Sequence, residues 1–296
     1  MNAARIIGWG LRTPLGVRAK DVAARVLGGD RAVGRAQGDV TASRHARFLA
    51  RLPLLALDAA HEAAHEAGLA GCDRVGVFAG VGGLRVDWDE LATALAEQHA
   101  DGSDAWARGL HRIHPFWMLR NLSNNSHALL AADLGARGDG MTLGGATAGA
   151  QAIAAASRAL AAGSIDAAIV VAYDTLLVPE LAALVDGPAE AAAAIVLAGS
   201  GTARASVAAA STADGESGEP RIETVARVAS RVCERSRASY VLEPGQLGAL
   251  GAATALVQAI VAAELLREQA VPGATALCLS TGAPGLAAAV VVEVAR

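Results

Sequence analysis

A glycine-rich turn that leads into an alanine-rich helix is the part of this sequence best suited to hold a reactive group. The turn covers Gly144 to Gly149, within the segment TLGGATAGAQAIAAASRALAAG of residues 142–163. A helix start presents unpaired N–H groups and the positive end of the helix dipole, which would lower the pKa of a thiol placed there. The turn instead carries Ala146 and Thr147, and all three cysteines lie elsewhere. The sequence therefore predicts a nucleophile site from which the nucleophile is missing.

The same turn fits the G-x-S-x-G pattern of hydrolases, with Thr147 in place of serine. Such hydrolases need an acid and a histidine later in the chain, and no histidine follows His127. A serine-type triad in its usual chain order is therefore excluded. Acyl transfer by altered chemistry at Thr147 stays open as an alternative, although a threonine hydroxyl without an adjacent base is a poor nucleophile.

The residues His61, Glu62 and His65 form an H-E-x-x-H pattern on an expected helix. Two histidines one helical turn apart can bind zinc while the glutamate activates water. The third-ligand position of the longer motif holds Gly71, which cannot coordinate a metal. A zinc hydrolase is thus a second alternative. The interpretation we favour is a solvent-facing helix surface with both histidines toward water and no bound metal or other cofactor.

Three more histidines flank an aromatic pair in the segment HRIHPFWMLRNLSNNSH of residues 111–127. They could line a pocket or hold a metal, but local hydrogen bonding is the commoner role of histidine. The aromatic pair indicates an interface, where such side chains concentrate. The histidines are His111, His114 and His127, and the pair is Phe116 and Trp117.

Composition narrows the class of protein. The chain has 296 residues, of which 53% are hydrophobic and 18% charged, so it can bury a large core. Its net charge of -4 and the lack of a basic tract argue against nucleic acid as a partner. Leu247 to Ala263 is almost wholly apolar, but Gln258 interrupts it and a spanning helix needs about 20 such residues. We expect a buried helix there, no membrane span, and a cytoplasmic protein, because three cysteines without paired spacing fit a reducing compartment.

Strands that are hydrophobic on both faces alternate with helices along the chain, which predicts a layered α/β fold. The polar segment 205–220 reads as a loop. Neither glycine cluster, at 80–83 or 199–201, completes a dinucleotide-binding motif. Helices are expected over 17–27, 52–67, 91–107, 115–134, 221–238 and 247–263, and strands over 5–8, 74–79, 167–173, 189–197, 276–279 and 287–294.

The order of these motifs resembles the β-ketoacyl synthases of the thiolase superfamily. IIGWGLRTPLG resembles that family's opening strand and turn, and LLALDAAHEAAHEAGL followed by DRVGVFAGVGG resembles its next helix and strand. ATAGAQAI is similar to the family's CxSGxQAI, and LGALGAATALVQAIVAAELL to its GHxxGAAG helix. The resemblance implies a thiolase-like α/β/α/β/α fold with two related halves. We expect one unit over 1–296, made of a first half at 1–200 and an abbreviated second half at 201–296.

The sequence departs from the family where the family holds its catalytic groups. The nucleophilic cysteine is replaced by Ala146, or by Thr147 if the upstream segment sets the register. The family's GHxxGAAG histidine falls on Gly248, and the lysine five residues earlier falls on Glu243. A second family histidine has no counterpart. Condensation needs an acyl-holding thiolate and donors that stabilise the developing charge, which these residues cannot supply.

The resemblance with these departures implies a non-catalytic subunit of the chain-length-factor type, paired with an active ketosynthase in fatty-acid, polyketide or polyene synthesis. An acyl carrier protein would be a further partner. Three arginines at four-residue spacing, Arg227, Arg231 and Arg235, could dock that acidic carrier, although a solvated basic face is the simpler interpretation. A homodimeric scaffold protein is the remaining alternative.

Overall fold

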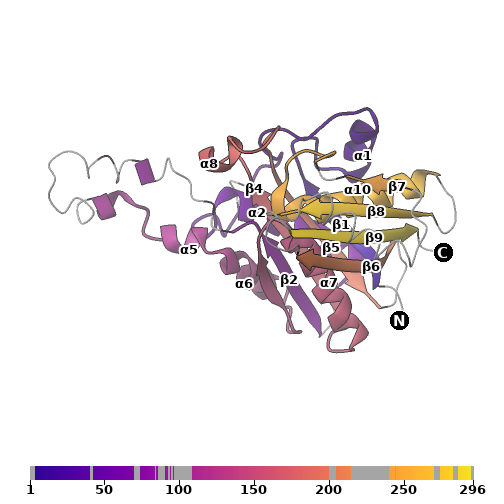
Figure 1. Ribbon diagram of the computed structural model, residues 1–296. Coiled ribbons are helices and arrows are strands. Elements are labelled where there is room, and N and C mark those ends of the chain that lie inside the picture. Colours follow the sequence, from indigo (N-terminus) through magenta and orange to yellow (C-terminus); the bar gives the residue numbers. More distant parts are fainter. Residues whose placement is uncertain are drawn as a thin grey trace.

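The chain folds around one large mixed sheet with helices on both faces (Figure 1). The computed structural model describes residues 4–40, 43–69, 74–83, 85, 91, 92, 94, 96, 109–199, 205–214, 240–243, 245–269, 274–282 and 286–294. The strands are β1 (Ala4–Arg12), β2 (Val75–Val81), β3 (Met141–Gly144), β4 (Ala167–Thr175), β5 (Glu190–Ala198), β6 (Ala205–Asp214), β7 (Tyr240–Leu242), β8 (Thr275–Thr281) and β9 (Leu286–Val294). The helices are α1 (Ala19–Leu27), α2 (Arg51–Ala67), α5 (Trp117–Asn121), α6 (Ser123–Asp133), α7 (Ala148–Ala161), α8 (Pro179–Ala182) and α10 (Thr254–Gln269), with 3₁₀ turns η1 (Leu110–Arg112) and η2 (Gly251–Ala253).

The strand order is β3-β2-β4-β5-β1-β6-β9-β8-β7. The first part runs parallel from β3 to β4 and antiparallel from β4 through β5 to β1. The second part repeats this scheme, with a parallel β7·β8 pair and antiparallel steps through β9 to β6. A short antiparallel pairing of β1 with β6 joins the two parts. The repeated scheme fits the expected related halves, while their division at residue 200 stays a prediction.

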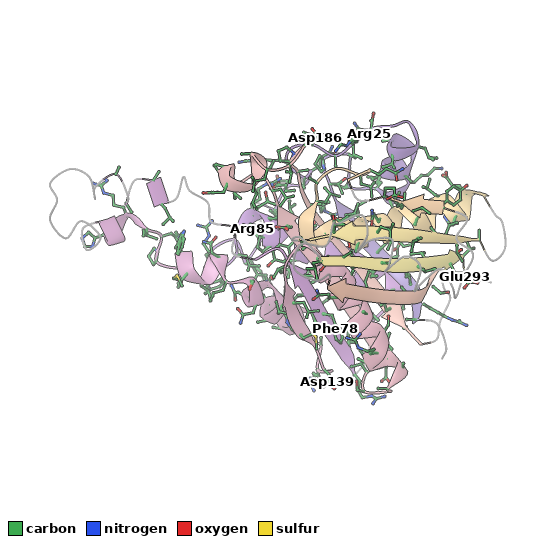
Figure 2. All side chains as sticks on the ribbon, viewed as in Figure 1. Arg25, Phe78, Arg85, Asp139, Asp186 and Glu293 are labelled. Atoms are coloured by element: carbon green, nitrogen blue, oxygen red, sulfur yellow. The ribbon has the colours of Figure 1, made fainter. Side chains whose placement is uncertain are left out.

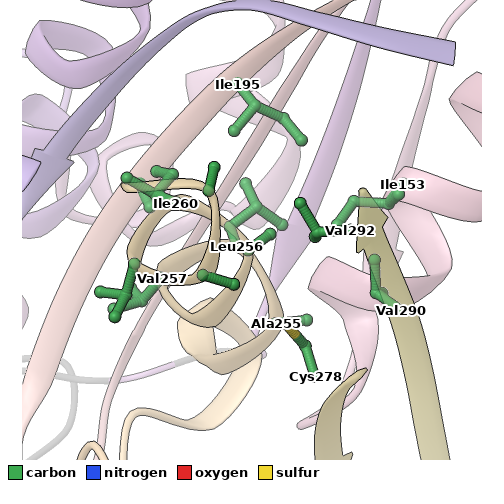
Figure 3. Close-up of a cluster of buried hydrophobic side chains, with 14 of the residues drawn as sticks. Ile153, Ile195, Ala255, Leu256, Val257, Ile260, Cys278, Val290 and Val292 are labelled. Carbon is green, nitrogen blue, oxygen red and sulfur yellow. The ribbon is translucent and has the colours of Figure 1, made fainter. Parts of the chain in front are cut away.

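Alternation of side chains along the central strands builds two separate cores. On β4, Val170 belongs to the core that includes α7 and α10, whereas Val171 faces the core that includes α2. The same alternation holds on β5, where Ile195 and Val196 face opposite sides. Figure 3 shows that side chains from α7, α10, β5, β8 and β9 meet in the first of these cores. Together with the contacts of α7 and α10 to strands of both parts, this places the two helices between layers of strands.

Small residues allow α2 to lie unusually close to the sheet. A Cβ atom added at Gly8 or Gly10 of β1 would fall well inside van der Waals contact with the backbone carbonyls of Ala63 and Ala59 on α2. The helix ends at Gly68, whose positive φ of 64° and N–H bonds to the last turn close it in the left-handed conformation. The expected helix over 52–67 and its expected end at Gly68 are therefore confirmed.

The structure corrects three expectations. The segment expected as a loop from residue 205 forms β6, because its backbone pairs along the full length of β9. The helix expected over 115–134 is divided at Leu122, whose ψ of 122° is extended. The helix expected from Leu247 begins only at Thr254, because Gly248 and Gly251 take positive φ angles. Within the described residues, no helix is long and apolar enough to cross a membrane.

Candidate functional site

The predicted turn around Ala146 and Thr147 and the helix that follows it are confirmed, and a short strand, β3, precedes the turn. β3 ends at Gly144, Gly145 takes a φ of 107°, and α7 begins at Ala148. Ala146 is half-buried in the turn, and Thr147 is buried as the N-cap of α7. The Thr147 hydroxyl accepts a hydrogen bond from the side-chain amide of Gln151 at 3.1 Å. Since that amide is a donor and not a base, this contact does not activate the hydroxyl as a nucleophile.

Close backbone packing leaves little space around the start of α7. A Cβ atom at Gly149 would overlap the carbonyl oxygen of Ala252 on η2, and one at Gly80 of β2 would lie 2.6 Å from the backbone of Ala148. The turn is therefore held between β2 and η2, and the second of these segments carries the GAA sequence of the expected GHxxGAAG motif. The two motifs that the sequence placed in different halves thus lie side by side.

The positions expected for the family's histidine and lysine carry Gly248 and Glu243. Gly248 has a φ of 103°, and a Cβ atom there would overlap the carbonyl oxygen of Ala32. The amide of Ala32 also donates a hydrogen bond of 2.9 Å to the carbonyl of Leu247. Glu243 is exposed, directly after β7. The expected histidine position is therefore in close contact with the backbone of Ala32, and the expected lysine position carries a carboxylate at the surface.

A buried ion pair beside η2 is the feature that sequence reasoning missed. Asp174, near the end of β4, has a fully buried side chain and accepts hydrogen bonds from Arg85 Nε at 2.9 Å, Ala252 N at 3.0 Å and Thr175 N at 2.9 Å. Burial raises the pKa of Asp174, and the donors, Arg85 first, oppose that effect. The only sequence signal was an acidic residue that closes the apolar run AAIVVAYD. Figure 2 shows Arg85 close to the strand ends.

A small cleft opens at this ion pair. Its cavity volume is about 70 Å³, and its walls include Arg85, Tyr173 and Asp174. Pockets for drug-sized ligands measure roughly 300–1,000 Å³. The hydroxyl of Tyr173 shares a hydrogen bond of 2.8 Å with Ser126, and burial raises its pKa to about 12. The cavity at this ion pair is therefore smaller than a typical ligand pocket.

The H-E-x-x-H residues do not converge on a common point. Glu62 pairs with Arg12 at 2.6 Å, and His61 Nε2 lies 3.3 Å from Asp133. His65 is exposed, as expected, whereas His61 is half-buried against α6 and does not simply face water. Among the residues that the structure describes, no group of three histidine, cysteine or acidic side chains could hold a metal ion. The zinc interpretation gains no support from these contacts.

The histidines around the aromatic pair also have separate local roles. His114 Nδ1 accepts a hydrogen bond from the Phe116 amide at 3.1 Å, and His111 lies in η1. His127 Nδ1 lies 2.8 Å from the hydroxyl of Thr142 on β3, and burial lowers its pKa. The His114 contact is the local hydrogen bonding that the sequence favoured, whereas the His127 contact joins α6 to β3. Figure 1 places α5 on the side of the molecule away from the two chain ends.

Large apolar side chains are exposed in and around α5 and at the start of the edge strand β3. Phe116 is 42% exposed and its ring lies 5.4 Å from that of Phe48, while Trp117 starts α5 half-buried. Among the described strands β3 is the last of the sheet, so none of them pairs with its outer edge. We call this surface the β3 face; its exposed large side chains are Phe116, Met118, Leu122 and Met141. The arginine stripe of Arg227, Arg231 and Arg235 lies outside the described residues.

The sequence matches the model of the β-ketoacyl synthase N-terminal domain over residues 36–216. The chain therefore belongs to the β-ketoacyl synthase family, and its fold is the thiolase-like fold of ketosynthases. No curated protein sequence matches it.

Solved structures of low sequence identity share this fold over their whole length. The ishigamide ketosynthase/chain length factor matches with a TM-score of 0.80 at 17% identity, covering 99% of this chain and 100% of that one. AntDE:AntF, a type II polyketide acyl-carrier protein in complex with its ketosynthase, gives 0.79 at 15% identity with full coverage of both chains. The ketosynthase ApeO in complex with its chain length factor ApeC, from Xenorhabdus doucetiae, gives 0.77 at 16% identity and covers 99% and 98%.

Proposed function

We propose that this chain is a non-catalytic ketosynthase-like subunit of the chain-length-factor type. The observation that carries the proposal is the turn before α7, which holds Ala146 and Thr147 where the family would present its cysteine. Gly248 supports it, because the backbone of Ala32 leaves no room for a histidine side chain there. A chain without thiolate and imidazole cannot hold and extend an acyl group by itself.

In this proposal the partner is an active ketosynthase, and the pair works with an acyl carrier protein in polyketide, fatty-acid or aryl polyene synthesis in the cytoplasm. Support comes from the similar solved structures, two of which are ketosynthases with chain length factors and one a ketosynthase with its carrier protein. The arginine stripe is the proposed carrier contact. Charge reversal at Arg231 should weaken carrier binding at low salt, and unchanged binding would remove that assignment.

The β3 face is the surface we assign to the ketosynthase. An unpaired strand edge offers backbone donors and acceptors to a second chain. Large apolar side chains that stay exposed beside it favour a protein–protein contact. The hydrogen bond from α6 to Thr142 fixes the edge strand against the body of the molecule, so the surface is presented in a defined geometry.

Co-expression with a ketosynthase that carries the cysteine and both histidines tests this function. Size-exclusion chromatography should show a one-to-one complex, and intact mass spectrometry should find the acyl group on the partner only. Met141→Asp should disrupt the complex, whereas Leu184→Asp, at a residue 77% exposed after α8, should leave it intact. A chain that stays homodimeric beside the ketosynthase would support the scaffold alternative. An acyl group bound covalently to this chain would support altered chemistry at Thr147.

A further inference from the structure

The turn before α7 has a counterpart before α10, in the second part of the fold. Three residues before the first residue of each helix stands a glycine with a positive φ, which is 107° at Gly145 and 53° at Gly251. The next residue is an alanine in both turns, Ala146 in the first and Ala252 in the second. The two turns therefore correspond, in agreement with the repeated scheme of strands.

The strands behind the two turns correspond as well. β4 follows α7 and β8 follows α10, and each strand has one parallel and one antiparallel neighbour. Ala172 of β4 lies 3.3 Å from where a Cβ atom would stand on the second residue of α7. Cys278 of β8 and the second residue of α10, Ala255, share one buried cluster (Figure 3). Two residues further along the strands come Asp174 and Ser280, so Ser280 is the counterpart of Asp174.

In the second part, a carboxylate of the chain itself occupies the turn. Asp174 reaches across from β4, and its Oδ2 accepts a hydrogen bond of 3.0 Å from the Ala252 amide. A Cβ atom at Gly251 would lie 2.0 Å from the same oxygen, so the carboxylate fills the space beside that glycine. A helix start favours such an anion, because its N–H groups are unpaired and the positive end of the helix dipole lies there.

In the first part, the corresponding place holds no carboxylate. Ser280 has a shorter side chain than Asp174, is 2% exposed, and its Oγ has no hydrogen-bond partner among the described residues. Buried polar atoms of this kind are uncommon in native proteins. The Ala146 amide donates to no described acceptor, and no described atom lies within 4 Å of a Cβ atom built at Gly145. The close packing around Gly149 therefore does not extend to this side of the turn.

We propose that the turn before α7 binds a small external carboxylate, with the Ala146 amide and the Ser280 hydroxyl as donors. The correspondence directs Ser280 toward this turn as it directs Asp174 toward the other one. An acetate-sized ligand suits the site, because Asp174 itself presents a carboxylate on a single methylene group. The 14-residue helix α7 contributes its dipole, and the half-buried Ala146 leaves the turn open to solvent. Arg85, which pairs with Asp174, has no counterpart in these contacts, so the binding should be weak.

Titration of the full chain with sodium acetate tests this site, with chloride holding the ionic strength constant. Saturation-transfer difference NMR of the acetate methyl group should give a saturable signal for the wild type. Ser280→Ala removes one donor and should weaken binding several-fold without loss of stability, since the hydroxyl has no partner to lose. Ser157→Ala is the matched control, because the Oγ of Ser157 on α7 is also buried without a partner, and it should bind like the wild type.

Ala146→Asp is a second variant, which places a negative charge in the turn and should abolish the signal. Absence of a saturable wild-type signal at tens of millimolar acetate would overturn the site. Undiminished binding by Ser280→Ala or by Ala146→Asp would also overturn it, because the acetate would then lie elsewhere on the chain. The site does not rest on the proposed function. The titration needs no partner, so its failure and failure of the ketosynthase pairing are separate results.

Discussion

Gly248 lies against the carbonyl oxygen of Ala32, and its φ of 103° is a backbone angle that residues with a side chain rarely adopt. The contact joins the loop before η2 to the loop after α1, and the bond from the Ala32 amide to Leu247 holds both in place. A side chain at position 248, the position expected for the family's histidine, would therefore meet the backbone of Ala32. Restoring the histidine alone would displace a backbone segment.

Gly248→Ala should lower the free energy of unfolding substantially. Unfavourable backbone conformation costs about 1–3 kcal/mol and overpacking adds about 1–3 kcal/mol. Gly245→Ala is the matched control, because Gly245 has a similar φ of 81° but no atom near its missing Cβ. Denaturant titration should give a larger loss for Gly248→Ala than for Gly245→Ala. Equal losses would show that the loop carrying Ala32 yields without cost.

Ala146→Cys should create a thiol that reacts without creating a condensing enzyme. The turn is half-buried and lies at the N-terminus of a 14-residue helix, which favours the thiolate. Burial raises the pKa of the native Cys278 thiol far above its ordinary value, so that thiol serves as an unreactive control. In a chain with Cys72→Ser and Cys233→Ser, iodoacetamide labelling followed by mass spectrometry should modify position 146 before Cys278. Elongation of an acyl group by the isolated variant would contradict the view that the other catalytic groups are absent.

The sequence predicted the elements that depend on local signals or on a continuous apolar run. α2 followed from its alanine and leucine content and from Gly68, and β4 and β5 from their apolar runs. β6 could not be found in this way, because its alanines, serines and threonines become a strand only by pairing with β9. The turn at residues 144–149 was likewise predictable from its glycines.

The ion pair of Arg85 with Asp174 was not predictable because its parts are 89 residues apart and its backbone donor, Ala252, is another 78 residues away. The same holds for the contact between His61 and Asp133, which are separated by 72 residues. Chemistry that depends on one buried carboxylate meeting donors from several elements becomes visible only with the fold.

Arg85→Ala should destabilise the chain more than Asp174→Asn does. The first variant leaves a buried carboxylate without its cation, which can cost about 3–5 kcal/mol, reduced here because Arg85 is 25% exposed. The second removes the charge and keeps one acceptor oxygen, for either the Ala252 or the Thr175 amide, which bond different oxygens of the carboxylate. In a double-mutant cycle, Arg85→Ala should be clearly milder in the Asp174→Asn background. Additive losses would show that the two side chains do not stabilise each other.

Asp133→Asn should destabilise the protein at neutral pH and not in strong acid. Burial would raise the pKa of Asp133, but hydrogen bonds from His45, Arg44 and His61 outweigh it and hold the pKa below its usual range. A carboxyl group with a lowered folded-state pKa contributes stability above its unfolded pKa of about 3.9, and that contribution is lost as the pH falls through the folded value. Urea titrations at pH 7 and near pH 2.5 should thus show a difference between wild type and variant that shrinks in acid. Asp186→Asn, whose carboxylate is 88% exposed in its pair with Arg31, is the control and should change little at either pH. A wild-type advantage that persists undiminished at the lower pH would mean that Asp133 acts through packing and not through its charge.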